Sequence, residues 1–169
     1  MTRATGVGAP EHLIERHDVT AFDSGTSDLD SWLKRRALAN EALGASRTYV
    51  VSASGRVVGF YALATGAVAH DDVTGRVRRN MPDPIPVMVL ARLAVDREYQ
   101  GGGLGRALLR DALLRTLQVA EIVGIRAVLV HAISTSAKRF YVRAGFHEAP
   151  VSPMTLMVTL TEVQRLMHP

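Results

Sequence analysis

Cysteine is absent from this chain of 169 residues, and its absence excludes several kinds of chemistry. Disulfide bonds, thiolate nucleophiles and cysteine-ligated zinc all need a residue that the chain lacks. No apolar run reaches the roughly 18 residues of a membrane-spanning helix. The N-terminus also has no apolar segment of the kind found in signal peptides. We therefore expect a cytoplasmic protein without a membrane partner.

Aromatic residues and metal-binding patterns are also scarce. Phe, Trp and Tyr make up 5% of the chain, so stacking on unpaired RNA bases should contribute little to any binding. The six histidines show neither H-x-x-x-H nor H-E-x-x-H spacing, and we expect no metal site. Lys and Arg exceed Asp and Glu by 20 to 16, and the sequence pI is about 10.0. That excess favours an anionic partner.

The length and hydrophobic pattern predict one domain over residues 1–169 that mixes helices and strands, with residues 1–10 frayed. A Ser at a helix start followed by an acid three positions later is an acidic capping box, and a glycine ends a helix well. In the N-terminal half we expect an edge strand within 12–20, a helix capped by Ser27 and Asp30 and ended by Gly44, a hairpin of 48–53 and 56–64 turning at Ser54-Gly55, and a polar, basic loop over 69–86.

The C-terminal half should alternate strands with helices, as expected for helices packed on a sheet. A nearly continuous apolar run is typical of a central strand. We expect this strand at 87–95, a helix from Leu104 to Gly124, a strand over 126–132, a helix capped by Ser134 or Thr135 and closed by Gly145, and a last strand over 154–160.

The run from Arg92 to Arg106 is the most informative part of the chain, because a strand enters a glycine-rich turn and a helix follows at once. Such a turn directs backbone N–H groups into one concavity at the positive end of a helix, where phosphate oxygens can bind. Counting G-x-G-x-x-G from the first or third glycine ends on Arg106 or Leu108, which excludes a dinucleotide fingerprint. No lysine follows, which excludes a P-loop. The spacing that fits is Q-x-x-G-x-G, at Gln100, Gly103 and Gly105.

This spacing resembles the acyl-CoA pyrophosphate loop of the GCN5-related N-acetyltransferases, the GNAT family. A second segment, Ala137 to Phe146, is similar to the A-x-x-F-Y-x-x-x-G-F segment of the same family. The resemblance extends over nearly the whole chain. It implies an α/β GNAT fold, in which a mixed central sheet has splayed central strands and helices on both faces. It also implies acetyl-CoA as co-substrate and no metal.

The resemblance assigns roles to individual residues. It implies that Tyr141 donates a proton to the CoA sulfur and that Arg106 adds positive charge at the first helical turn. Arg97 is a candidate for the ribose 3′-phosphate, or equally a solvated surface arginine. It also implies that the end of the central strand pairs with the pantetheine arm and that the glycine turn binds the pyrophosphate. The acetyl-CoA contacts implied are Leu93, Ala94, Val95, Gln100, Gly101, Gly102, Gly103, Leu104, Gly105, Arg106 and Phe140.

The central strand lacks the glutamate base that many members of the family place there, since 87–95 contains no carboxylate. A lysine amine has a pKa of about 10.4 and is rarely neutral at pH 7, whereas an α-amine at about 7.7–8.0 is neutral far more often. The missing base therefore favours an α-amine substrate. A loop carboxylate, Asp71 or Asp72, could instead fold inward as the base.

Segments 22–25, 29–33, 46–50 and 90–96 resemble the GNAT toxins of bacterial toxin–antitoxin operons, with Ser24 where a cysteine is frequent. That resemblance implies acetylation of the α-amine of charged tRNA, which blocks translation, and restraint by a ribbon-helix-helix antitoxin. Basic side chains bind phosphates without reading sequence. The candidate tRNA contacts, each with a solvated surface as the alternative, are Lys34, Arg35, Arg36, Arg76, Arg78 and Arg79.

Two other functions stay open at this point. The chain could be a GNAT enzyme of a small-molecule amine or a protein N-terminus, although the basic loop argues against a small cationic amine. It could also be a module that binds CoA or an antitoxin without turnover, although an intact Gln100, Gly103, Gly105 and Tyr141 argue against decay. The sequence leaves the acceptor tRNA and the oligomeric state undecided, and a homodimer is among the options.

Overall fold

The computed structural model describes residues 6–150 and 152–168 and divides the chain into two compact units. The first comprises Met1–Ala64 and Ala91–Ala112, and the second Thr65–Leu90 and Leu113–Pro169. Among the described residues seven strands follow the hydrogen-bonded order β1-β2-β3-β4-β5-β7-β6. Parallel and antiparallel pairs both occur, so the expected mixed α/β class is confirmed. The single domain over 1–169 stays a prediction.

The first unit contains an antiparallel ladder and the glycine turn. β1 pairs with β2, and β2 pairs with β3, both antiparallel. Ser54 and Gly55 both have positive φ, 51° and 78°, as a tight hairpin turn requires. The predicted hairpin is confirmed. The elements of this unit are β1 (Glu11–His12), α1 (Ser27–Arg35), α2 (Ala37–Leu43), β2 (Arg47–Ala53), part of β3 (Arg56–Val68), the end of β4 (Ile85–Val95), η2 (Arg97–Tyr99) and the start of α4 (Leu104–Val119).

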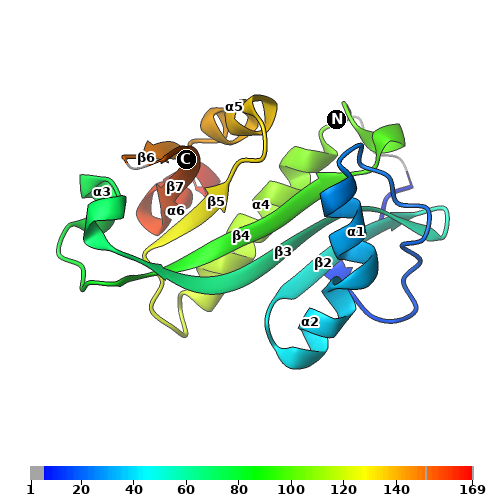
Figure 1. The fold of residues 1–169 in the computed structure, drawn as a ribbon, viewed down its shortest axis with the longest axis horizontal. Helices are drawn as coiled ribbons and strands as arrows, with labels where there is room; N and C mark the ends of the chain where they lie inside the picture. The colour runs from blue at the N-terminus through cyan, green and yellow to red at the C-terminus, as the bar shows by residue number, and fades with distance from the viewer. Residues whose placement is uncertain (1–5, 151, 169) are drawn as a thin grey trace. The chain divides into compact units, whose positions relative to one another are not determined.

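Helices cover both faces of the sheet within this unit. Leu29 and Leu33 of α1 pack in a buried cluster with Phe60 of β3, and Figure 1 shows α1 lying over β2 and β3. Successive strand residues face opposite sides, and Gly59 faces α4. A Cβ on Gly59 would lie 3.0 Å from Leu108 Cδ1. The missing side chain therefore lets α4 approach β3 closely, on the side opposite α1.

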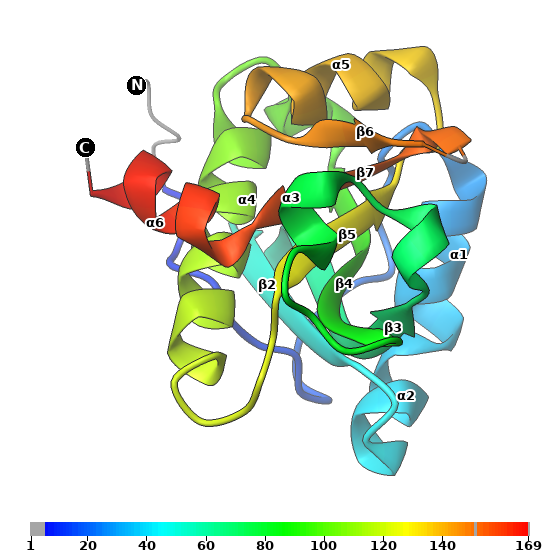
Figure 2. The same ribbon diagram turned by 90° about the vertical axis from the view of Figure 1, so that its left-hand side faces the viewer.

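The second unit joins strands of both directions. β4 and β5 pair in parallel from Val87–Leu90 to Ala127–Val130, while β7 runs antiparallel to β5 and β6. The central strands were also predicted to separate. That separation would involve the part of β4 after Leu90, beyond its pairing with β5, and it stays a prediction. The elements, most of them visible in Figure 2, are the end of β3, η1 (His70–Asp72), α3 (Gly75–Arg78), the start of β4, the end of α4, β5 (Ala127–His131), α5 (Thr135–Arg143), β6 (His147–Ala149), β7 (Ser152–Thr159) and α6 (Leu160–Met167).

The expected helix from Ser27 to Gly44 is two helices with a different cap. Thr26 is the N-cap, and the Asp30 carboxylate accepts hydrogen bonds from Ser24 N–H and Oγ–H. The capping-box prediction was therefore wrong. Arg36, at φ −118°, separates α1 from α2. No glycine or proline stands at this position, so the sequence carries no local signal for the break. Gly44 does end α2 in the left-handed conformation, at φ 74°.

The predicted loop over 69–86 contains two short helices that we did not expect, η1 and α3. The last strand predicted over 154–160 is confirmed as β7, but it is followed by a helix, α6, that we did not predict. Val73 and Val77 lie four positions apart and are both buried against Ile85, which anchors the short helix α3. After β7, Thr159 caps α6 in a full capping box with Glu162, a local signal in the sequence that we overlooked. The helix α4 ends at Val119, before the expected Gly124.

The N-terminal predictions were partly wrong. The edge strand expected within 12–20 is confined to Glu11–His12, because the chain then turns at Ile14–His17. In that turn the Ile14 N–H donates to Nδ1 of the buried His17. Gly8 is not frayed, since its N–H donates to Ser52 O at 3.0 Å. Residues 1–5 lie outside the described part. No helix among the described residues is long and apolar enough to cross a membrane.

Candidate functional site

The end of β4 is fixed by a buried carboxylate that sequence reasoning missed. Asp96 is 3% exposed and accepts hydrogen bonds from Arg56 Nη1 at 2.9 Å and from the N–H groups of Glu98 and Asp23. Burial opposes ionisation of this carboxyl, but the hydrogen bonds outweigh burial and lower the pKa of Asp96. An Asp that directly follows an apolar strand and caps a turn was the available signal. Asp96 thus fixes the point at which the chain leaves β4 for the glycine turn.

The glycine turn has the conformation that the motif predicts. Gly101 and Gly103 have φ of 84° and 89°, and a Cβ built on either would meet nothing within 4 Å. The Gly103 carbonyl accepts the N–H of Ala107, so the N–H groups from Gly103 to Arg106 have no partner within the helix. Three consecutive exposed glycines therefore leave the positive end of a 16-residue helix open. This geometry fits a pyrophosphate.

Gln100 braces the turn through its side chain. Its Nε2 donates to the carbonyls of Ser24, at 2.9 Å, and Val95, at 2.8 Å. Those bonds tie the turn to the end of β4 and to the segment before α1. Leu104 also has a structural role, because its side chain is buried and faces Gly59. The side chains of both residues therefore position the turn. The Gln100 N–H donates to Arg97 O at 3.5 Å, whereas the Leu104 N–H lies in the first turn of α4, where the helix itself offers no acceptor.

Among the other predicted cofactor contacts, Ala94 is buried, whereas Leu93 and Val95 are half-buried at the end of β4. Arg106 is exposed in the first turn of α4, and no side-chain partner is recorded for it among the described residues. Arg97 is not simply a solvated arginine, because its Nε lies 3.1 Å from Asp23 Oδ1.

Tyr141 belongs to the second unit and is the buried residue of α5, 6% exposed. Its ring meets Phe140 and Phe146 edge to face, at centroid distances of 5.0 Å and 5.5 Å. Ser134 caps α5 through the Ala137 N–H, and Gly145 closes it at φ 107°, both as predicted. Burial raises the pKa of Tyr141. The phenol therefore remains protonated throughout the neutral range.

The two basic clusters differ in how free their side chains are. Lys34, Arg35 and Arg36 are exposed at the end of α1, without a side-chain partner in the part of the chain described. Arg76, in contrast, pairs with Glu162 Oε2 at 2.9 Å and contacts His147. The Arg76 side chain is still 62% exposed, and its contact with tRNA stays a prediction in which phosphate would compete with Glu162.

The other two members of the loop cluster also differ. Arg78 Nη1 donates to the carbonyls of Val73, at 3.2 Å, and His70, so this arginine supports the chain around α3. Arg79 is exposed directly after α3 and has no recorded side-chain partner among the described residues. It is the freer phosphate candidate of the pair.

No group of three or more His, Asp or Glu that could hold a metal is found in residues 6–150 and 152–168. Asp71 and Asp72, the alternative bases, are exposed in η1. His131 contacts Thr155 Oγ1 at 3.0 Å on the neighbouring strand, which agrees with a structural role.

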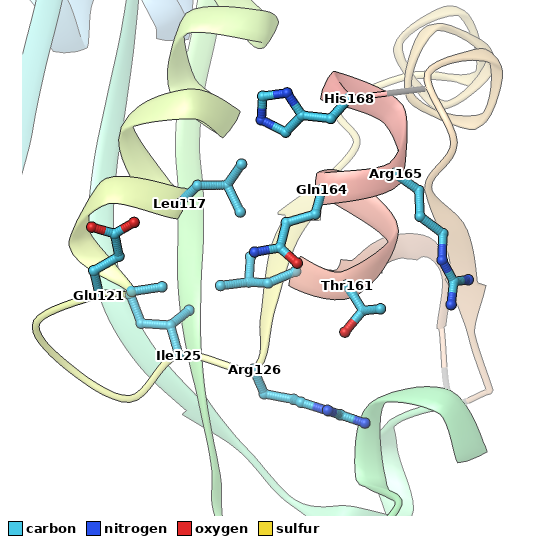
Figure 3. Close-up of a pocket in the computed structure, with 10 residues that line it drawn as sticks. Leu117, Glu121, Ile125, Arg126, Thr161, Gln164, Arg165 and His168 are labelled. Carbon is cyan, nitrogen blue, oxygen red and sulfur yellow. The ribbon is translucent and has the colours of Figure 1, made fainter.

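A cavity of about 700 Å³ lies in the second unit, between the end of α4, residues 120–126 and α6. In Figure 3, Leu117 and Gln164 point toward each other across it, while Arg165 points away. None of the residues that the sequence predicts for acetyl-CoA, proton donation or RNA lines this cavity. The predicted site residues instead lie on the strand end, the glycine turn, α5 and the basic clusters.

Comparison with known proteins gives one family. A model described as "Acetyltransferase (GNAT) domain" matches residues 44–148. This range contains β4, the glycine turn, α5 and α3, so it includes every predicted acetyl-CoA contact and Tyr141.

Relatives and solved structures match nearly the whole chain. A "tRNA-acetylating toxin" of Mycobacterium tuberculosis is 52% identical over 162 residues, which is 96% of this chain and 98% of the relative. The structure of AtaT complexed with acetyl-methionyl-tRNAfMet has a TM-score of 0.87 at 24% identity, covering 95% of this chain and 99% of that one. A mutant AtaT toxin bound to the C-terminus of the antitoxin AtaR and acetyl-CoA has a TM-score of 0.81 at 24% identity, covering 96% and 99%. At this identity the structures establish the fold.

Proposed function

The chain belongs to the acetyltransferase (GNAT) domain family, and we propose that it is an acetyl-CoA-dependent N-acetyltransferase that acetylates the α-amine of aminoacyl-tRNA and so blocks translation. One observation carries the choice of substrate: the 52% identity, over nearly the full length of both chains, to a protein named a tRNA-acetylating toxin. Charged tRNA is used in the cytoplasm, and we place the activity there.

The glycine turn is the proposed seat of the acetyl-CoA pyrophosphate. Exposed N–H groups at the start of α4 meet the phosphate oxygens, and Arg106 adds a full positive charge. Bound there, acetyl-CoA supplies a thioester whose acetyl group can pass to an amine. Leu93 and Val95 offer backbone groups to the pantetheine arm at the end of β4, which Gln100 and Asp96 hold in place.

Tyr141 is the proposed proton donor. Acyl transfer breaks the carbon–sulfur bond and forms a carbon–nitrogen bond, and the departing thiolate takes up a proton. The raised pKa of Tyr141 keeps a proton on its oxygen. Its ring packs edge to face against Phe140 of α5 and against Phe146, which follows the helix. These contacts hold the ring and so fix the direction of the hydroxyl.

The amine must be neutral before it can attack, and β4 carries no carboxylate to deprotonate it. An α-amine is neutral near pH 7 far more often than a lysine amine. Attached through its carboxyl group to the 3′ end of a tRNA, that amine also belongs to a polyanion, which suits an exposed basic surface. The proposed inhibitor is an antitoxin, with a ribbon-helix-helix DNA-binding segment, that restrains the enzyme until it is needed.

The decisive experiment supplies radiolabelled acetyl-CoA and charged tRNA to the purified protein. Label should enter charged tRNA, and it should not enter the same tRNA after the aminoacyl ester has been hydrolysed. Free lysine, polyamines and N-terminal peptides serve as competing acceptors. Efficient acetylation of any of these, with charged tRNA untouched, would leave an N-acetyltransferase of another amine. No transfer to any acceptor, with acetyl-CoA still bound, would indicate a binding module.

Arg79→Glu should raise the KM for charged tRNA. The slope of log KM against log salt concentration should fall by about one, as expected for the loss of one phosphate contact. The affinity for acetyl-CoA should stay unchanged. The expected increase in this KM is about 10-fold at low salt, because the guanidinium is exposed and unpaired among the described residues. Arg165→Glu is the matched control, since Arg165 is another exposed arginine, on α6. Equal effects of the two substitutions would mean that only total charge matters.

A further inference from the structure

Arg92 on β4 is held in a fixed position by a stack of aromatic rings. Its guanidinium carbon lies 4.9 Å from the centroid of the Trp32 ring. Trp32 is stacked in turn on Phe60, at 6.1 Å and an interplanar angle of 11°, and Phe60 is completely buried. One further bond, from Nη1 to the carbonyl of Ala91 at 2.9 Å, orients the guanidinium. Arg92 is therefore a pre-oriented cation on a rigid base.

In residues 6–150 and 152–168 no acidic side chain forms an ion pair with this cation. The only side-chain contacts recorded for Arg92 among the described residues are Trp32 and the Ala91 carbonyl. A half-buried arginine without a carboxylate is unusual, because charged groups that leave water are normally paired. By contrast, the nearby Arg56 and Arg97 are paired with Asp96 and Asp23. Arg92 retains unused Nε and Nη2 donors, which suit the oxygens of a phosphate.

The surroundings of Arg92 are basic and lie next to the proposed reaction centre. Arg35 stands three positions after Trp32 on α1 and Arg36 caps the helix, so both fall on the side of Trp32. Leu93, the proposed partner of the acetyl-CoA arm, is the next residue along β4. An anion held by Arg92 would therefore lie close to the amine that receives the acetyl group.

We infer that Arg92, stacked on Trp32, binds the phosphodiester that precedes the 3′-terminal nucleoside of the acceptor and so positions the aminoacyl amine. The inference rests on the proposed function. In a charged tRNA that phosphodiester is separated from the aminoacyl ester by one nucleoside, which makes it the nearest anion to the reacting amine. Lys34, Arg35 and Arg36 would then meet phosphates further along the same strand.

The test compares two small acceptors that differ by one phosphodiester. One is an aminoacyl ester of adenosine, which has no phosphate, and the other is the same ester of the dinucleotide CpA. Arg92→Gln should lower kcat/KM for the CpA ester by about 10-fold to 100-fold, the usual effect of one lost charge-assisted hydrogen-bonded contact, mainly through KM. It should leave kcat/KM for the adenosine ester unchanged.

Arg92→Lys and Trp32→Leu separate charge from position. Lysine keeps the charge but loses the forked, stacking guanidinium, so we expect a smaller loss on the CpA ester. Trp32→Leu removes the ring on which Arg92 lies and should produce the same selective loss. Arg56→Gln is the control for an arginine of the first unit that is paired with acids, and it should not distinguish the two esters.

The outcomes separate this inference from the proposed function. Equal losses on both esters would overturn the role of Arg92, with acetylation of aminoacyl acceptors intact. If the wild-type protein acetylates neither ester nor charged tRNA, the proposed function is wrong. In that case the phosphate site is tested by the binding of CpA that carries no aminoacyl group. If Arg92→Gln does not weaken that binding, Arg92 does not bind the phosphodiester.

Discussion

Tyr141→Phe is expected to lower turnover on charged tRNA by about 10²-fold to 10⁴-fold, the usual cost of a lost proton donor. The substitution removes one oxygen and keeps the ring that packs against Phe140 and Phe146. The melting temperature and acetyl-CoA affinity should therefore stay close to those of the wild type. Steady-state kinetics and calorimetry on the same preparations measure all three quantities.

Tyr61→Phe provides the matched control, because it also removes a hydroxyl from a buried tyrosine. The Tyr61 hydroxyl donates to Asp111, so its loss should cost about 1 kcal/mol of stability and leave turnover unchanged. In cells, the wild-type chain expressed without a partner should arrest bacterial growth. Tyr141→Phe should relieve the arrest, whereas Tyr61→Phe should not. Unchanged turnover in Tyr141→Phe would make Tyr141 a core residue.

The dependence of turnover on pH gives a second measure of the same residue. A free tyrosine has a pKa of about 10, and burial raises the pKa of Tyr141. The protonated form is the donor, so raising the pKa extends its range to higher pH. Deprotonation of Tyr141 should therefore cause no loss of turnover below about pH 10. If the wild-type enzyme did lose turnover in that range, the loss would be assigned to Tyr141 only if it disappeared in Tyr141→Phe. Such a decline would contradict the buried, protonated phenol.

Features that depend on neighbours in sequence were predicted well. Ser54-Gly55, Gly44, Gly145 and the glycine turn all specify backbone conformations that a few consecutive residues determine, and each adopts the expected one. The cap of α5 by Ser134 is likewise a contact across three positions. Such signals are readable because the interacting groups are fixed by spacing alone.

Features that depend on distant partners could not be read from the sequence. Arg76 was predicted to contact tRNA and Arg92 had no predicted role, yet Arg76 pairs with a glutamate 86 positions away and Arg92 stacks on Trp32. Asp96 meets an arginine 40 positions away. No spacing rule relates these pairs, because the packing of separate elements decides which side chains meet. The helix α6 is different, since its capping box was local and was overlooked.

Gly103→Glu is expected to abolish acetyl-CoA binding within the range of calorimetry, a loss of at least about 100-fold. Two effects act together. Gly103 has φ 89°, where a residue with a Cβ costs roughly 1–2 kcal/mol. A carboxylate at the positive end of α4 would also replace the attraction for phosphate with repulsion.

Two variants separate these effects. Gly103→Ala introduces the strain without the charge and should weaken binding by about 10-fold or less. Gly44→Glu introduces both at the end of α2, where φ is 74° and a Cβ meets nothing within 4 Å. It should cost similar stability and leave acetyl-CoA affinity unchanged. If Gly103→Glu binds acetyl-CoA as the wild type does, the pyrophosphate does not sit in the glycine turn. If Gly44→Glu loses affinity to the same extent, the loss reflects general destabilisation, because only its position distinguishes it from Gly103→Glu.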